Sequence, residues 1–153
     1  MEEKLEILLD GLKKKQNALE EIVNITTNQQ VVIKSRLTHT EIMAFILEMN
    51  IEKQQFIKIV KTCDDMFERL LQEVGPTLDA QVNMYKPQVA DLQKYIRQIM
   101  DLDKNIRTLE EENNKLIDEI RPKNIKPEIR QKSALTIDER KVLKAYKEGS
   151  KLV

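Results

Sequence analysis

Apolar residues recur in alternating steps of four and three residues over most of the first 120 positions of this chain. This spacing follows one face of an α-helix, and glycine and proline, which interrupt helices, number only 3 and 4 in 153 residues. The first stretch has the seam residues Leu5, Leu9, Leu12, Leu19, Val23 and Ile33. It predicts one amphipathic helix over residues 2–34. Further apolar residues beside this seam widen the stripe, so we expect the helix to contact more than one neighbour.

A second stretch with the same period follows a short interruption at residues 34–40. Thr38 and Glu41 have the spacing of a capping box, in which each side chain satisfies a free backbone N–H group at a helix start. The sequence therefore predicts that a second helix begins directly after Thr38.

The end of this second helix is predicted from two breakers. Apolar seam positions continue as far as Val74, with Lys53 as the one break. Gly75 and Pro76 come next. Glycine accepts the left-handed conformation found after many helices, and proline cannot continue the hydrogen-bond ladder. We therefore predict that the helix stops at this dipeptide.

A third periodic stretch runs from Leu78 to Ile120, with Pro87 inside it. Either the main helix starts at Pro87, or a longer helix kinks there because proline removes one backbone hydrogen bond. After Ile99 the apolar register slips by one three-residue step. Helices of similar length with short connections favour antiparallel packing. We predict an all-α fold, an elongated antiparallel three-helix bundle or coiled coil, over residues 1–121.

The chain changes character at its C-terminal end. Residues 122–135 contain two prolines, four basic side chains and no clear period, which predicts a flexible linker. Thr136 and Glu139 resemble another capping box, so a short helix is expected over residues 136–148. A helix this short is marginal alone in water. We therefore predict that residues 122–153 form a mobile tail that becomes ordered only when it docks.

The charge distribution excludes some partners and separates the tail from the rest. Basic and acidic residues both number 26, so no net charge directs the chain to nucleic acid or to a membrane. From Arg121 onward, however, ten basic and four acidic residues give a net charge of +6, which leaves −6 on residues 1–120. No apolar run approaches a membrane span or a signal peptide. We expect a cytoplasmic protein with no stable membrane insertion and no nucleic-acid partner.

The residues that enzymes use are scarce in this sequence. His39 is the only histidine, which excludes a paired-histidine metal site and a Ser-His-Asp triad. Three scattered glycines cannot form a phosphate-binding loop. Glu110, Glu111 and Glu112 lack the Glu-x-x-His pattern of a di-metal bundle, so we interpret them as a solvated acidic face. We predict a binding module without cofactor, metal or small-molecule substrate, and not an enzyme.

The remaining chemically distinctive residues are expected to pack in the core. Cys63, the only cysteine, lies on the apolar seam of the second helix and predicts a small buried group. Phe45, Phe56 and Phe67 are eleven residues apart, about three full turns, so they predict a ridge along the same helix. We expect this ridge to be part of the core.

Several short motifs occur in an order that resembles bacterial flagellar export chaperones of the FlgN type. After a long leucine-rich first helix comes Asn50-Ile51-Glu52-Lys53, which leads into Phe56-Ile57. Leu92-Gln93-Lys94-Tyr95-Ile96 follows early in the third periodic stretch. Glu112-Asn113-Asn114 and a short final helix with Ala145-Tyr146 complete the order. The resemblance covers essentially the whole chain.

The resemblance implies a cytoplasmic chaperone for hook–filament junction (hook-associated) proteins. Such a chaperone covers a terminal helical segment of its client and delivers it to the cytoplasmic domain of the flagellar type III export gate. Family members bind clients through their C-terminal half. By position, the partner-binding residues implied here are Leu109, Leu116, Ile117, Ile120, Ile129, Leu135, Val142, Leu143 and Tyr146. Tyr146 is also the candidate contact for the gate.

Two other functions fit the same sequence. One is a different type III secretion chaperone with a helical-hairpin architecture. The other is a structural coiled-coil scaffold that associates with itself. A scaffold should form a permanent oligomer and bind no additional peptide. Polar residues on the seam, such as Gln16, Thr26 and Asn113, disfavour a stable homomeric coiled coil because they lower its stability.

Overall fold

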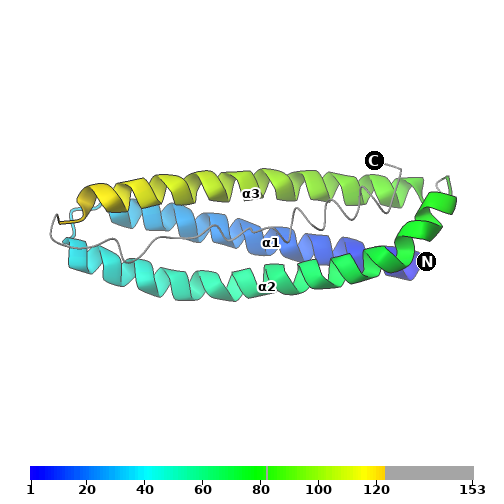
Figure 1. The fold of residues 1–153 in the computed structure, drawn as a ribbon, viewed down its shortest axis with the longest axis horizontal. Coiled ribbons are helices and arrows are strands. Elements are labelled where there is room, and N and C mark those ends of the chain that lie inside the picture. Colours follow the sequence, from blue (N-terminus) through cyan, green and yellow to red (C-terminus); the bar gives the residue numbers. More distant parts are fainter. Residues whose placement is uncertain (82, 123–153) are drawn as a thin grey trace.

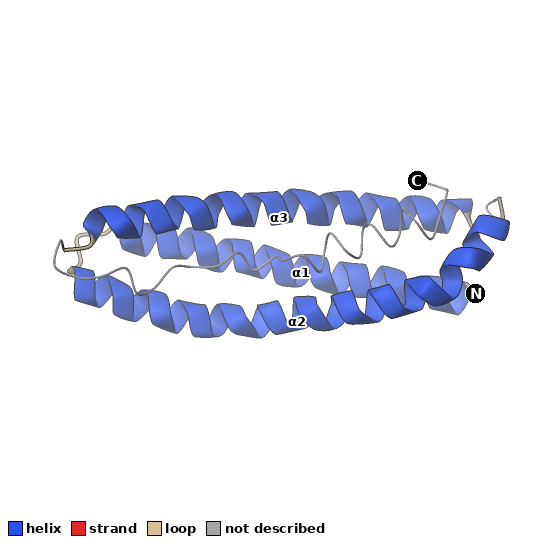
Figure 2. Ribbon diagram, viewed as in Figure 1, coloured by secondary structure: helices blue, strands red, loops and turns tan. Residues whose placement is uncertain are grey.

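Three long helices make up the fold. The computed structural model describes residues 1–81 and 83–122, which form α1 (Glu2–Ile33), α2 (His39–Ala80) and α3 (Lys86–Ile120). The chain reverses direction at each connection, so the helices lie side by side in an elongated antiparallel bundle (Figure 1). Among the described residues there is no strand (Figure 2). The all-α three-helix bundle predicted from the sequence is therefore confirmed.

The helix α1 lies between the other two. Its backbone packs closely along both α2 and α3, whereas α2 and α3 approach each other much less. The wide apolar stripe of α1 explains this arrangement, because one helix with two neighbours needs more than a narrow seam. Apart from Pro122, the predicted tail over residues 122–153 and its short helix over 136–148 lie outside the described residues.

The start of α2 agrees with one half of the predicted capping box, because the Thr38 side chain binds a backbone N–H whereas the Glu41 carboxylate binds the Thr38 hydroxyl. Thr38 is the N-cap, and its hydroxyl oxygen accepts a hydrogen bond from the Glu41 backbone N–H at 3.2 Å. The same hydroxyl donates to the Glu41 carboxylate at 3.0 Å. The two side chains therefore fix the point at which the chain enters α2.

The predicted end of α2 at Gly75-Pro76 is wrong. The helix continues through both residues to Ala80, and no described glycine has a positive φ angle. Val74 and Leu78 on either side are fully buried. Of the two, Leu78 belongs to the extra turn, and its burial stabilises that turn by about 1.5–3 kcal/mol, which offsets most of the roughly 3 kcal/mol that an internal proline costs. Figure 1 shows α2 bending near this end, as an internal proline predicts.

The start of α3 decides between the two alternatives at Pro87. The helix begins at Lys86, so Pro87 lies in its first turn, where its missing N–H has no intrahelical partner to lose. The predicted slip of register after Ile99 is wrong. Glu110 and Ile117, which continue the register that precedes the predicted slip, are buried. Residues of the shifted register are only half-buried: Leu102, Leu109 and Leu116.

The core forms two clusters of unequal size. The main cluster extends over most of the bundle and includes Leu8, Leu19, Leu71, Leu92 and Ile106. The distal cluster lies where α1 ends, α2 begins and α3 ends. Its buried residues are Ile33, Ile42, Ile46 and Ile117, with Val32, Met43, Leu116 and Ile120 packed against them. We call this part of the bundle the distal end.

The predicted phenylalanine ridge enters the core only at one end. Phe67 is buried, Phe56 is half-buried, and Phe45 is 47% exposed, so the expected core position of Phe45 is wrong. Eleven residues correspond to roughly 20° more than three turns, so each successive ring is rotated further from the core. Cys63 is buried, as predicted. No helix among the described residues is long and apolar enough to cross a membrane.

Candidate functional site

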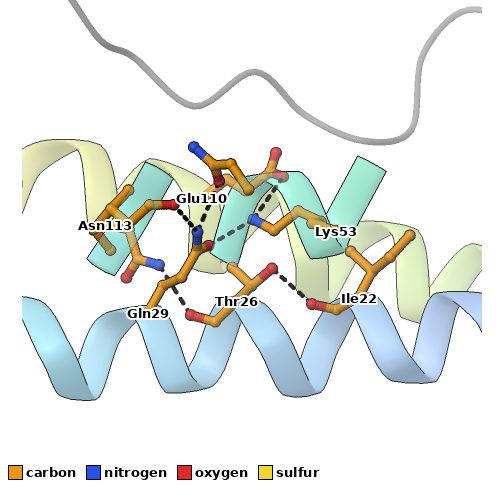
Figure 3. A network of polar contacts seen from close by, with 8 residues as sticks. Ile22, Thr26, Gln29, Lys53, Glu110 and Asn113 are labelled. Carbon is orange, nitrogen blue, oxygen red and sulfur yellow. Dashed lines mark hydrogen bonds and ion pairs between the residues drawn. The ribbon is translucent and has the colours of Figure 1, made fainter. Parts of the chain in front are cut away.

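Six polar side chains meet inside the bundle and form what we call the polar layer. Each helix contributes two of them: Thr26 and Gln29, Asn50 and Lys53, and Glu110 and Asn113. All are buried except Asn50, which is half-buried. Figure 3 shows the labelled members converging from the three helices. A buried layer of this kind departs from an apolar core, and its contacts therefore need explanation.

Lys53 links all three helices. Its Nζ atom donates to the Gln29 Oε1 atom of α1 at 2.6 Å and lies 3.9 Å from the Glu110 Oε1 atom of α3. Burial lowers the pKa of Lys53 to about 8, because the charged ammonium is removed from water, and the nearby Glu110 carboxylate opposes this effect. The predicted solvated position of Glu110 is wrong, since its side chain is buried against the ammonium of Lys53.

The other members of the polar layer join α1 to its neighbours through amides. The Gln29 Nε2 atom donates to the Asn50 Oδ1 atom at 2.7 Å, so both ends of the Gln29 amide bind α2. The Asn113 Nδ2 atom donates to the Thr26 backbone carbonyl at 3.0 Å. These contacts require one relative position of the helices, because a shift of either α2 or α3 would break them.

The polar layer separates the two apolar clusters along the bundle. On α1 it lies between Ile22 of the main cluster and Ile33 of the distal cluster, and on α3 between Ile106 and Ile117. The distal cluster has four buried residues and is much the smaller of the two. The distal end therefore has less apolar burial to stabilise it than the rest of the bundle.

The distal end also carries most of the exposed apolar side chains. The described residues include eight large exposed hydrophobic side chains: Ile7, Val31, Leu37, Phe45, Leu47, Ile51, Met84 and Met100. Five of these eight lie between Val31 and Ile51, around the turn from α1 to α2. Apolar groups gathered in one region of a surface are typical of a site that another protein covers.

The partner-binding residues implied by the resemblance fall into three groups. Leu116, Ile117 and Ile120 pack in the distal cluster, so α3 already uses them to contact its neighbours. Leu109 is half-buried about two to three turns earlier. The other five lie outside the described residues: Ile129, Leu135, Val142, Leu143 and Tyr146.

Sequence reasoning missed the exposed residues Leu47 and Ile51 and the buried residues Gln29 and Glu110. Leu47 and Ile51 stand four residues apart and off the seam of α2, which is the signal that a search for a second apolar stripe would detect. No comparable signal exists for Gln29 or Glu110, because their burial depends on the register between helices.

Among residues 1–81 and 83–122, no group of three or more His, Cys, Asp or Glu side chains is arranged to hold a metal ion. Comparisons with protein-family models, with curated proteins and with solved structures gave no match to this chain.

Proposed function

We propose that this protein is a chaperone that binds a terminal helical segment of a hook–filament junction protein and delivers it to the flagellar type III export gate. The proposal combines the order of motifs in the sequence with one structural observation. That observation is the gathering of exposed apolar side chains at the distal end, the same end of the bundle as the described α3 residues that the resemblance assigns to client binding.

The chemistry of such a client suits this surface. A helical segment that has not yet assembled exposes an apolar face, and it binds by laying that face on apolar side chains of another helix. At the distal end, Phe45, Leu47 and Ile51 are already exposed to water. Covering them with a client helix removes apolar area from water at both surfaces, which favours association.

The small distal cluster supplies a second reason for client binding at this end. Leu116 and Ile120 of α3 are only partly buried there. A modest movement of the last turns of α3 would make them available to a client. Because the polar layer separates this cluster from the main one, such a movement would leave the main core intact.

Calorimetric titration tests the proposal. The full chain is titrated with synthetic terminal helical segments of hook–filament junction proteins. A full-length variant with Val142→Ser, Leu143→Ser and Tyr146→Ser, and a chain truncated after Arg121, serve as comparisons. We expect binding at micromolar or lower Kd with a negative ΔCp, weakened or lost in both altered chains. Absence of binding by the full chain, together with a concentration-dependent oligomer, would favour the self-associating scaffold instead.

A further inference from the structure

Three apolar residues form a stripe on the outer surface of α2. Leu47 is 46% exposed and Ile51 is 68% exposed, and they lie four residues apart, so they are neighbours on one face of the helix. Ala44, also exposed, precedes Leu47 by three residues. We call Ala44, Leu47 and Ile51 the α2 stripe. None of the three belongs to either core cluster.

The surface beside the α2 stripe is acidic. Glu41, Glu48 and Glu52 are exposed, and they are the only acidic residues between positions 40 and 57. The single basic residue in that part of α2, Lys53, is buried in the polar layer. Exposed side chains in this stretch therefore carry a net charge of −3.

These three carboxylates occupy one side of the helix. At 3.6 residues per turn, Glu48 and Glu52 are one turn apart, and Glu41 lies about two turns before Glu48. Like charges at a spacing of four residues repel each other and destabilise the helix. Basic groups placed beside them would relieve this repulsion.

We propose that the α2 stripe and its acidic border bind an amphipathic helix of a partner protein whose apolar face is flanked by lysine or arginine. Apolar side chains of the partner cover Leu47 and Ile51, and its basic side chains lie beside Glu48 and Glu52. This inference rests on the proposed function and deepens it, because Leu47 and Ile51 belong to the apolar surface offered to a client and the acidic border specifies that the bound helix carries basic flanks.

Charge identifies the partner more closely than the apolar stripe does. A second copy of this chain would present the same acidic border, and a symmetric pair would bring like charges together. A helix with basic flanks instead gains attraction along the full length of the border. The partner is therefore a basic amphipathic helix and not another copy of the bundle.

Fluorescence anisotropy with the full chain tests this inference. The probe is a labelled helical peptide of about three heptads, with leucines at a/d spacing and lysines on both flanks. A second peptide has glutamate in place of every lysine. Leu47→Gln/Ile51→Gln removes the stripe and Glu48→Gln/Glu52→Gln removes the border.

Two variants serve as matched controls. Met84→Gln alters an apolar residue, 67% exposed, at the opposite end, and Glu3→Gln/Glu6→Gln removes two exposed carboxylates from α1.

We expect the lysine peptide to bind the unaltered chain and the glutamate peptide to bind far more weakly. Removing the stripe should weaken binding by about tenfold or more, and removing the border by several-fold. The affinity of the control variants should stay within about twofold of that of the unaltered chain, and circular dichroism should show the same helix content in all chains.

Three results would overturn the inference: an equal loss of affinity in the control variants, equal binding of both peptides, or no binding of the lysine peptide. So would a dimer of the unaltered chain that Leu47→Gln/Ile51→Gln dissociates. Failure to bind junction-protein segments would leave this result unaffected, so the two proposals fail separately.

Discussion

Lys53 of α2 and Glu110 of α3 face each other inside the bundle, with 3.9 Å between the Nζ and Oε1 atoms and both side chains almost fully buried. Gln29 of α1 binds the same ammonium. One buried ion pair and one amide therefore connect three helices that are separated by dozens of residues in sequence.

Replacing only Lys53 should lower the free energy of unfolding more than replacing Lys53 and Glu110 together. Lys53→Met removes the ammonium that faces the buried Glu110 carboxylate, and we expect the free energy of unfolding to fall by about 3–5 kcal/mol. Lys53→Met/Glu110→Met replaces both charges with apolar groups of similar volume, so it should recover most of that loss. Urea denaturation of the two variants measures the difference. A double variant as unstable as the single one would show that the pair does not act as a unit.

The lowered pKa of Lys53 predicts a rise in stability with pH. In the folded state this ammonium loses its proton at a pH of about 8, compared with 10.5 for an unperturbed lysine. Between these values the unfolded chain binds more protons, so the free energy of unfolding increases as pH rises, by at most about 1.4 kcal/mol per pH unit. Urea midpoints measured from pH 7.5 to 10.5 should show this rise in the unaltered chain relative to Lys53→Met/Glu110→Met. Parallel pH profiles would contradict it.

Asn113 should stabilise the folded bundle less than an apolar residue at the same position would. Its amide nitrogen binds the Thr26 carbonyl, while its Oδ1 atom is buried without a hydrogen-bond partner among the described residues. Asn113→Leu should raise the free energy of unfolding by about 1–2 kcal/mol, because it removes a buried polar group. It should also weaken the register, so sedimentation velocity is expected to show more than one species. A less stable variant would indicate that the Thr26 contact outweighs the buried oxygen.

Pro76 should be unfavourable to α2 even though the helix tolerates it. Pro76→Ala restores a backbone N–H that can donate to the Gln72 carbonyl, and it removes the clash of the proline ring with that carbonyl. The gain of roughly 3 kcal/mol is reduced by about 1 kcal/mol, because proline also restricts the unfolded chain. Thermal unfolding should show a net increase of about 2 kcal/mol. A decrease would mean that the bend at this end is needed for packing.

Periodicity alone predicted much of this fold, and the reason is visible at particular residues. The limits of α1 and the cap at Thr38 each follow from local chemistry within a few residues, whereas Pro87 left two alternatives open for the start of α3. The end of α2 could not be predicted in this way. Its last turn is stabilised by burial of Leu78, which depends on how α2 packs in the bundle.

The candidate site was much less accessible from the sequence. Glu110 belongs to a run of three glutamates, and that composition indicates a solvated face. Its burial requires Lys53 to lie at the same level along the bundle axis on another helix. The sequence of either segment alone does not determine how the two helices are aligned along that axis. The same limit applies to Phe45, whose exposure follows from a small rotation accumulated over twenty-two residues from Phe67.

Hydrogen exchange of the full chain, with and without a saturating terminal segment of a hook–filament junction protein, tests the central claim most directly. We predict increased protection of backbone amides in residues 40–52 and 109–122, at the distal end, and unchanged exchange in residues 66–81 at the opposite end. Protection restricted to residues 66–81, or identical exchange with and without the segment, would contradict the claim that the distal end binds a client helix.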